Sequence, residues 1–133
     1  MSRAYLIDPE AETITEFEYS GLESIYTALQ CDTVDAATFN ENRDSVFIDD
    51  EGQLKNPTRF FCIEGYPQPL AGRGLVCGLD GEGETVEPTV GLEWLKAHVC
   101  YVERIAVGGA KGLAISGPAS AHTMQMIQRA FIG

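Results

Sequence analysis

The chain has few basic residues and few histidines. It holds 9 lysines and arginines against 20 aspartates and glutamates, with 2 histidines, so its formal net charge is −11. A protein surface with this excess of negative charge repels the phosphates of DNA and RNA, which argues against direct nucleic-acid binding. No two of the 4 cysteines stand at the C-x-x-C spacing that is typical of zinc sites. We therefore expect neither a bound metal nor a cofactor.

Long apolar segments are also missing. No stretch approaches the roughly 20 apolar residues that a membrane-spanning helix needs, and the opening sequence MSRAYLIDPE lacks the pattern of a signal peptide. We therefore expect a cytoplasmic protein that does not contact membranes. Cys62, Cys77 and Cys100 each stand within an apolar run, which predicts reduced, buried thiols.

Catalytic signatures are absent as well. The chain contains no G-x-S-x-G motif. His98 and Cys100 are two positions apart and would share one face of a strand, which makes them the candidate base and nucleophile. The sequence shows no acid that would orient this pair. It therefore favours a protein that is not an enzyme, with His98 and Cys100 as the enzymatic alternative.

The acidity that is present lies in the first part of the chain. Residues 1–54 contain 13 acids against Arg3 and Arg43, a net charge of −11, whereas residues 55–133 contain 7 acids and 7 bases. This asymmetry predicts an acidic face, which is either a solvated surface that aids solubility or a docking face for a basic protein, such as one that normally holds nucleic acid. The residues expected on this face are Glu16, Glu18, Asp49, Asp50 and Glu51.

Three of these carboxylates are consecutive in the segment VFIDDEGQLKNP. An EF-hand loop needs oxygen ligands at alternating positions and a glutamate at the twelfth, which this segment does not supply. Acid–base catalysis needs two carboxylates in different environments, whereas neighbours on an exposed turn are equally solvated. Because Gly52 follows, the segment predicts a turn.

Two glycine-rich segments supply a second hypothesis. Residues 71–74 include Gly72, Arg73 and Gly74, and residues 108–112 include Lys111. Because a cation in a glycine loop can approach an anion closely, these segments would form a binding module for a small molecule or nucleotide. Neither has the spacing of a nucleotide-binding fingerprint, and ordinary loops that need glycine's backbone freedom are the favoured explanation of both.

The periodicity predicts an α+β fold. Serine and glutamate at positions 20 and 23 form a capping-box pattern before LESIYTALQ, which predicts a helix over about 21–30. We also expect a short helix that starts near Thr89, a loop over 66–74, and a last helix with Pro118 in its first turn. Strands are expected at RAYLID, TITEFEYS, TVDAATF, SVFID, TRFFCIEG, GLVCGL and HVCYVERIAV. Short connections favour a single domain, residues 1–133, with a mainly antiparallel sheet packed by the first and last helices.

Several segments together resemble a known family. YLIDPEAETITEFEYSGLESIYTALQCDTVDAA, VFIDDEGQLKNP and PLAGRGLVCG follow one another in this order, and GLEWLKAHVCYVE comes later. They resemble a family of small proteins encoded by bacteriophages, plasmids and their hosts, a domain of unknown function. The resemblance covers roughly residues 5–78. It implies an accessory protein of mobile elements that acts on host machinery by binding, and it supplies no catalytic residues. By analogy with other acidic proteins of this kind, the chain would mimic nucleic acid.

The residues after Glu103 depart from that resemblance. We expect about 104–133 to be an addition specific to this chain. Its apolar residues, among them Ile105, Met124 and Phe131, suit packing either on the same domain or on another copy, so a homo-oligomer remains open.

Overall fold

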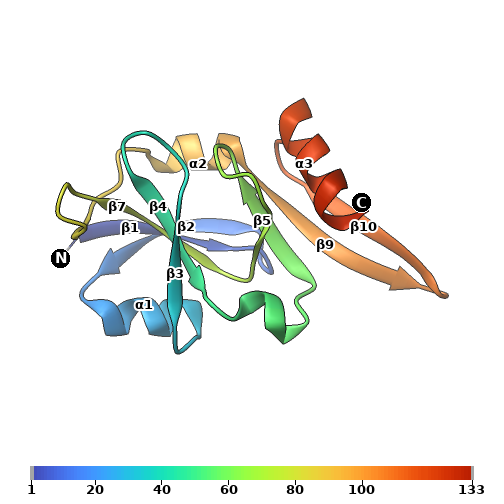
Figure 1. Ribbon diagram of the computed structural model, residues 1–133, viewed down its shortest axis with the longest axis horizontal. Helices are drawn as coiled ribbons and strands as arrows, with labels where there is room; N and C mark the ends of the chain where they lie inside the picture. Colours follow the sequence, from blue (N-terminus) through green and yellow to red (C-terminus); the bar gives the residue numbers. More distant parts are fainter. Residues whose placement is uncertain (1, 133) are drawn as a thin grey trace.

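The computed structural model describes residues 2–132, which fold into two antiparallel sheets with the first and last helices on their outer faces (Figure 1). The first sheet has the strand order β2-β1-β7-β4-β3, with β8 paired to β7, and the second has the order β10-β9-β5-β6. The predicted α+β class is confirmed, although the strands divide between two sheets.

Strands outnumber helices along the chain, and most strands follow one another in runs. Their bounds are β1 (Ser2–Asp8), β2 (Thr13–Tyr19), α1 (Leu22–Leu29), β3 (Val34–Thr38), β4 (Asp44–Asp49), the 3₁₀ helix η1 (Gly52–Lys55), β5 (Arg59–Ile63), β6 (Leu70–Ala71), β7 (Gly74–Leu79), β8 (Thr85–Val86), α2 (Leu92–His98), β9 (Val99–Val107), β10 (Ala110–Ser116) and α3 (Ala121–Phe131).

Alternation along the strands gives the sheets their apolar faces. In β1, Tyr5 and Ile7 pack in the core between the two sheets, whereas Ala4 packs with α1. In β5, Phe61 belongs to the core between the sheets, whereas Phe60 packs with α3. The molecule is therefore layered in the order α1, first sheet, second sheet, α3, and Figure 1 shows α1 and α3 on opposite sides.

Helix α1 buries Ile25 and Leu29, as its apolar spacing predicts. The predicted capping box is wrong. Gly21 is the N-cap residue, with φ 108°, and this places Ser20 one position too early to cap the helix. Instead, the Ser24 hydroxyl donates to the Gly21 carbonyl at 2.6 Å and accepts from the Ser20 N–H at 3.2 Å.

Other element boundaries also differ from the sequence predictions. Helix α2 begins at Leu92 rather than near Thr89, because the N–H and hydroxyl of Thr89 are bound to Asp44. Helix α3 begins at Ala121 with Ser120 as its N-cap, so Pro118 lies before the helix and not in its first turn. The segment 66–74 is not all loop, since β6 pairs with β5.

Residues 99–132 complete the second sheet. Strand β9 pairs with β5, where Cys100 lies opposite Cys62, and α3 buries Met126 and Ile127 against this sheet. The segment after Glu103 therefore packs on its own chain. None of the helices within residues 2–132 is long and apolar enough to cross a membrane.

Candidate functional site

The acids predicted to form one face lie in two places. Glu16 and Glu18 are exposed on β2, an edge strand of the first sheet. Asp49 ends β4, and Asp50 and Glu51 form the turn that follows it. Because β1 and β7 lie between β2 and β4, the structure does not bring the five carboxylates together.

The ion pairs of the two groups also differ. Glu16 lies beside Arg3, with Oε1 3.7 Å from Nε. Asp49 is paired with Lys55 at 2.6 Å, and its other oxygen accepts the N–H of Glu51 at 2.9 Å. Asp49 therefore holds the turn together, and the carboxylates of Asp50 and Glu51 are exposed to solvent. The predicted turn is confirmed, with η1 completing it.

One further acid joins Asp49, Asp50 and Glu51. Val34 lies opposite Asp49 in the pairing of β3 with β4, and the Asp50 N–H donates to the Thr33 carbonyl at 3.1 Å. This places Asp32 next to the turn, whereas Asp35 lies opposite Ile48 and faces the other side of the sheet. We call the set Asp32, Asp49, Asp50 and Glu51 the acidic corner. Sequence reasoning did not find Asp32, since only strand register joins it to the turn.

The acidic corner affects the pKa of a neighbouring thiol, that of Cys31. Partial burial, reinforced by the charges of Asp49 and Asp32, raises the pKa of Cys31. This thiol therefore stays protonated at neutral pH. Within residues 2–132, no group of three or more His, Cys, Asp or Glu side chains is arranged to hold a metal ion.

Asp44 belongs to the acidic segment but not to its surface. Its carboxylate is fully buried and accepts hydrogen bonds from the Asn40 amide at 2.8 Å, from the Thr89 N–H at 2.8 Å and hydroxyl at 2.6 Å, and from the Val90 N–H at 3.2 Å. These bonds fasten the β3–β4 hairpin to the segment before α2. The role of Asp44 is therefore structural.

The two cations of the glycine-rich segments lie on different sides of the molecule. Arg73 donates to the Ala28 carbonyl near the end of α1, at 3.2 Å, and its guanidinium lies 3.7 Å from Asp8. Lys111 lies on β10 in the other sheet, in a groove beside α3. The structure thus does not join them in one site. The expectation that 108–112 is a loop is wrong in part, since Lys111 and Gly112 belong to β10.

Backbone conformation and packing explain why the two residues beside Arg73, Gly72 and Gly74, are glycines. Gly72 has φ 76°, in the left-handed region that favours glycine. Gly74 lies under the second sheet, where a Cβ atom would come within 2.5 Å of the Phe61 ring and 2.6 Å of Val46. These requirements account for both glycines without a ligand.

His98 and Cys100 do not share a strand face, so that prediction is wrong. His98 is the last residue of α2, with its ring stacked on Trp94 at 4.2 Å and Nδ1 2.7 Å from the Trp94 carbonyl oxygen. Cys100 is fully buried in β9 beside Cys62. The buried thiols are confirmed: a hydrogen bond to Cys100 together with burial raises the pKa of Cys62, and burial raises the pKa of Cys77 to about 12.

The fold defines an α+β protein built on two antiparallel sheets. The chain belongs to the family described as Domain of unknown function (DUF3846), whose model matches residues 1–96. It is also similar to Uncharacterized protein y4iR of Sinorhizobium fredii (strain NBRC 101917 / NGR234), with 33% identity over 98 residues, 71% of this chain. The match spans 60% of that relative's length. No solved structure matches the chain.

Proposed function

We propose that this chain is a non-enzymatic interaction protein that docks a basic protein at the acidic corner. The observation that carries the proposal is the concentration of charge in this part of the chain: residues 1–54 have a net charge of −11 and the rest is neutral. At the acidic corner, the carboxylates of Asp50 and Glu51 are exposed, and Lys55 pairs with Asp49. Such a surface steers a basic partner toward it and strengthens the encounter at low salt.

We place the protein in the cytoplasm, as an accessory protein of phage or plasmid type that acts on host machinery. A partner surface that normally holds nucleic acid would carry the complementary charge, in which case the acidic corner would take the place of phosphates. Glu16 and Glu18 lie away from the acidic corner and would contribute only to the long-range field.

The test is affinity capture from a bacterial lysate at low and at high salt, followed by mass spectrometry. The variant Asp50→Lys/Glu51→Lys reverses the exposed charges and leaves Asp49, which holds the turn, in place. The control Glu82→Lys/Glu84→Lys makes the same change of charge in the turn after β7, at the opposite end of the first sheet.

We expect a basic protein to be retained at low salt by the wild type and by the control, and to be lost at high salt. The corner variant should retain roughly tenfold less, since two reversed charges oppose the encounter. Equal retention by the corner variant would show that the acidic corner does not dock the partner.

A further inference from the structure

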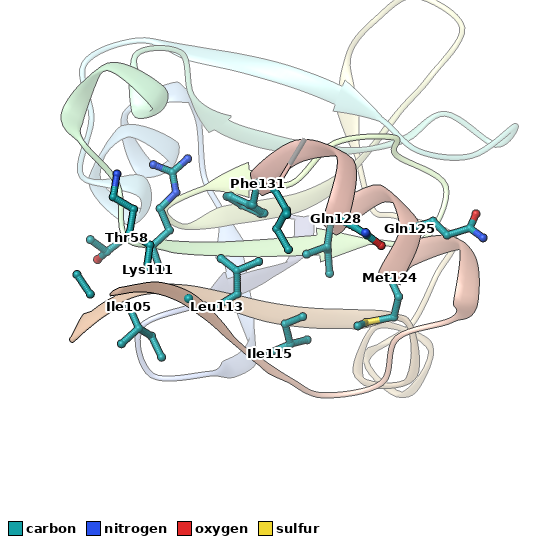
Figure 2. Close-up of a pocket in the computed structure, with 14 residues that line it drawn as sticks. Thr58, Ile105, Lys111, Leu113, Ile115, Met124, Gln125, Gln128 and Phe131 are labelled. Atoms are coloured by element: carbon teal, nitrogen blue, oxygen red, sulfur yellow. The ribbon is translucent and has the colours of Figure 1, made fainter. Parts of the chain in front are cut away.

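A groove of about 930 Å³ runs between α3 and the β9–β10 hairpin (Figure 2). Its lining comes from both strands of the hairpin and from α3, and its members are mostly apolar. They include Ile105, Leu113, Ile115, Met124, Ile127 and Phe131. In Figure 1 the hairpin projects from the body of the molecule at the lower right, with α3 above it. The groove is on a different layer from the acidic corner.

The apolar side chains of the groove are incompletely covered. Ile105 is 38% exposed, Ile115 is 37% exposed, Met124 is 43% exposed and Ile132, at the end of α3, is 71% exposed. Contiguous apolar surface of this kind marks interaction sites in soluble proteins. Leucine, isoleucine and methionine side chains supply burial energy to an occupant that covers them.

One wall of the groove is an open sheet edge. Strand β10 is the end strand of the second sheet, and within residues 2–132 it pairs with β9 alone. Lys111, Leu113 and Ile115 of β10 all line the groove, as expected for alternate residues of a strand. An extended chain added beside β10 would form backbone hydrogen bonds with its free edge and place every second side chain in the groove.

The charge of the groove is opposite to the net charge of the chain. Arg104 and Lys111 line it, and no carboxylate does, although acids outnumber bases in the chain. Arg104 is held in place by the rings of Phe60 and Phe131, each with its centroid 5.2 Å from the guanidinium carbon. The carboxylate of Glu103 is paired with Arg59 at 2.8 Å.

The groove has apolar side chains along its length and cations at one end. Figure 2 shows Lys111 and Thr58 at one end, Met124 and Gln125 at the other, and Leu113 and Ile115 between them. A complementary occupant has apolar groups along its length and a negative charge at one position.

We propose that β10 and α3 bind an extended peptide segment of a partner protein, with apolar residues at alternate positions and a carboxylate that meets Arg104 and Lys111. An aliphatic carboxylate would match the apolar lining and the charge of the groove but would leave the backbone edge of β10 unpaired. A second copy paired through its own β10 would bring no carboxylate to Lys111, since that strand, AKGLAIS, contains no acid. An extended acidic peptide would pair with the free edge of β10, cover the apolar lining of the groove and bring a carboxylate to Arg104 and Lys111.

The experiment is a selection from phage-displayed random linear peptides on the intact protein, followed by binding of the strongest sequence as a synthetic peptide. We expect selected sequences with alternating apolar residues and an aspartate or glutamate. Amide chemical shifts on binding should change along β10 and α3. Lys111→Glu should weaken the peptide roughly tenfold or more, the loss typical of a charge-assisted hydrogen bond.

The matched control is Lys96→Glu, an exposed lysine on α2 outside the groove, which should bind the peptide as the wild type does. A selection without enriched sequences would overturn the proposal, as would equal binding by Lys111→Glu or shift changes away from β10. Decanoate is the probe for an aliphatic anion, and sedimentation velocity is the probe for self-association. Decanoate binding in the groove combined with a selection that enriches no sequence would assign the groove to an aliphatic anion, and a dimer lost on Lys111→Glu would assign it to a second copy; either result would overturn the proposal.

Discussion

Asp44 differs from the other acids of residues 1–54 because its carboxylate is buried and engaged in four hydrogen bonds. A carboxylate can accept at both oxygens, whereas an asparagine side chain presents an NH₂ group to one set of donors. The donors facing that group would be left unsatisfied. The two acceptor oxygens of Asp44 therefore hold β4 to the segment before α2.

We expect Asp44→Asn to lower the free energy of unfolding by about 3 kcal/mol, the cost of losing charge-assisted hydrogen bonds in a buried site. Urea denaturation measures the change. Asp50→Asn removes the same charge from an exposed turn and should change stability by less than about 0.5 kcal/mol. Similar values for the two variants would contradict the assignment of Asp44 as a buried structural acid.

The sequence predicts residue roles only where the cause is local. It predicted the turn at Asp49–Gly52, because acids followed by glycine form turns in many contexts. It did not separate Asp44 from its neighbours, since the hydrogen-bond partners Thr89 and Val90 lie 45 and 46 positions away. Gly74 is similar, because the Phe61 ring that requires a glycine there comes from the other sheet.

Among the elements, α3 is anchored by its first turn. The Ser120 side chain accepts the Thr123 N–H at 3.1 Å, and the hydroxyls of Ser120 and Thr123 each donate to the Glu64 carboxylate at 2.8 Å. These hydrogen bonds, that of Thr123 first, lower the pKa of Glu64. The Glu64 carboxylate, just after β5, thereby holds the start of α3 to the second sheet.

The lowered pKa of Glu64 makes this anchor dependent on pH. A carboxyl whose pKa is lower in the folded state adds stability above its unfolded pKa of about 4.3, and that stability is lost as the pH falls through the folded pKa. We expect Glu64→Gln to cost about 1 kcal/mol at pH values near 7. The difference from wild type should shrink when unfolding is measured at acidic pH, below the folded pKa.

Glu82→Gln is the control for this measurement, because Glu82 is exposed in the turn after β7 and its side chain makes no hydrogen bond to another described residue. It should behave as the wild type at both pH values. A deficit of Glu64→Gln that is equal at both pH values would show that charge at Glu64 does not contribute to the anchor.

Elements were predicted better than the pairing between them. The helix expected over about 21–30 and the strand expected at TITEFEYS depend on local patterns, and both are confirmed by α1 and β2. The division into two sheets depends on pairs such as β1 with β7 and β5 with β9, which join residues far apart in sequence. No local pattern encodes those pairs. For the same reason the groove beside α3 was not predicted.

At the scale of the whole molecule, uneven charge opposes folding. Acids outnumber bases by 11, and the ion pairs among the described residues are partly exposed, so they offset little of the repulsion. Salt screens repulsion between exposed charges, with a screening length that falls from about 30 Å at 0.01 M to about 10 Å at 0.1 M. Stability should therefore increase over this range.

We expect the melting temperature to rise by roughly 2–4 °C between these two NaCl concentrations, for about 1 kcal/mol of relieved repulsion. Differential scanning fluorimetry measures the shift. The variant Asp50→Asn/Glu51→Gln has two fewer charges at the acidic corner and should show a smaller rise. A melting temperature that falls with salt would mean that the ion pairs outweigh the repulsion.

Strand β7 lies between β1 and β4, so the first sheet has a consequence for synthesis of the chain. The β1–β2 and β3–β4 hairpins can each form as they leave the ribosome, but neither has its neighbour until residues 74–79 emerge. From the end of β2 at Tyr19 to the end of β7 at Leu79, synthesis takes of the order of 3–12 s at about 5–20 residues per second. During translation the nascent chain therefore exposes two hairpins with free edges, and the ribosome-bound intermediate is the state most exposed to strand-pairing errors.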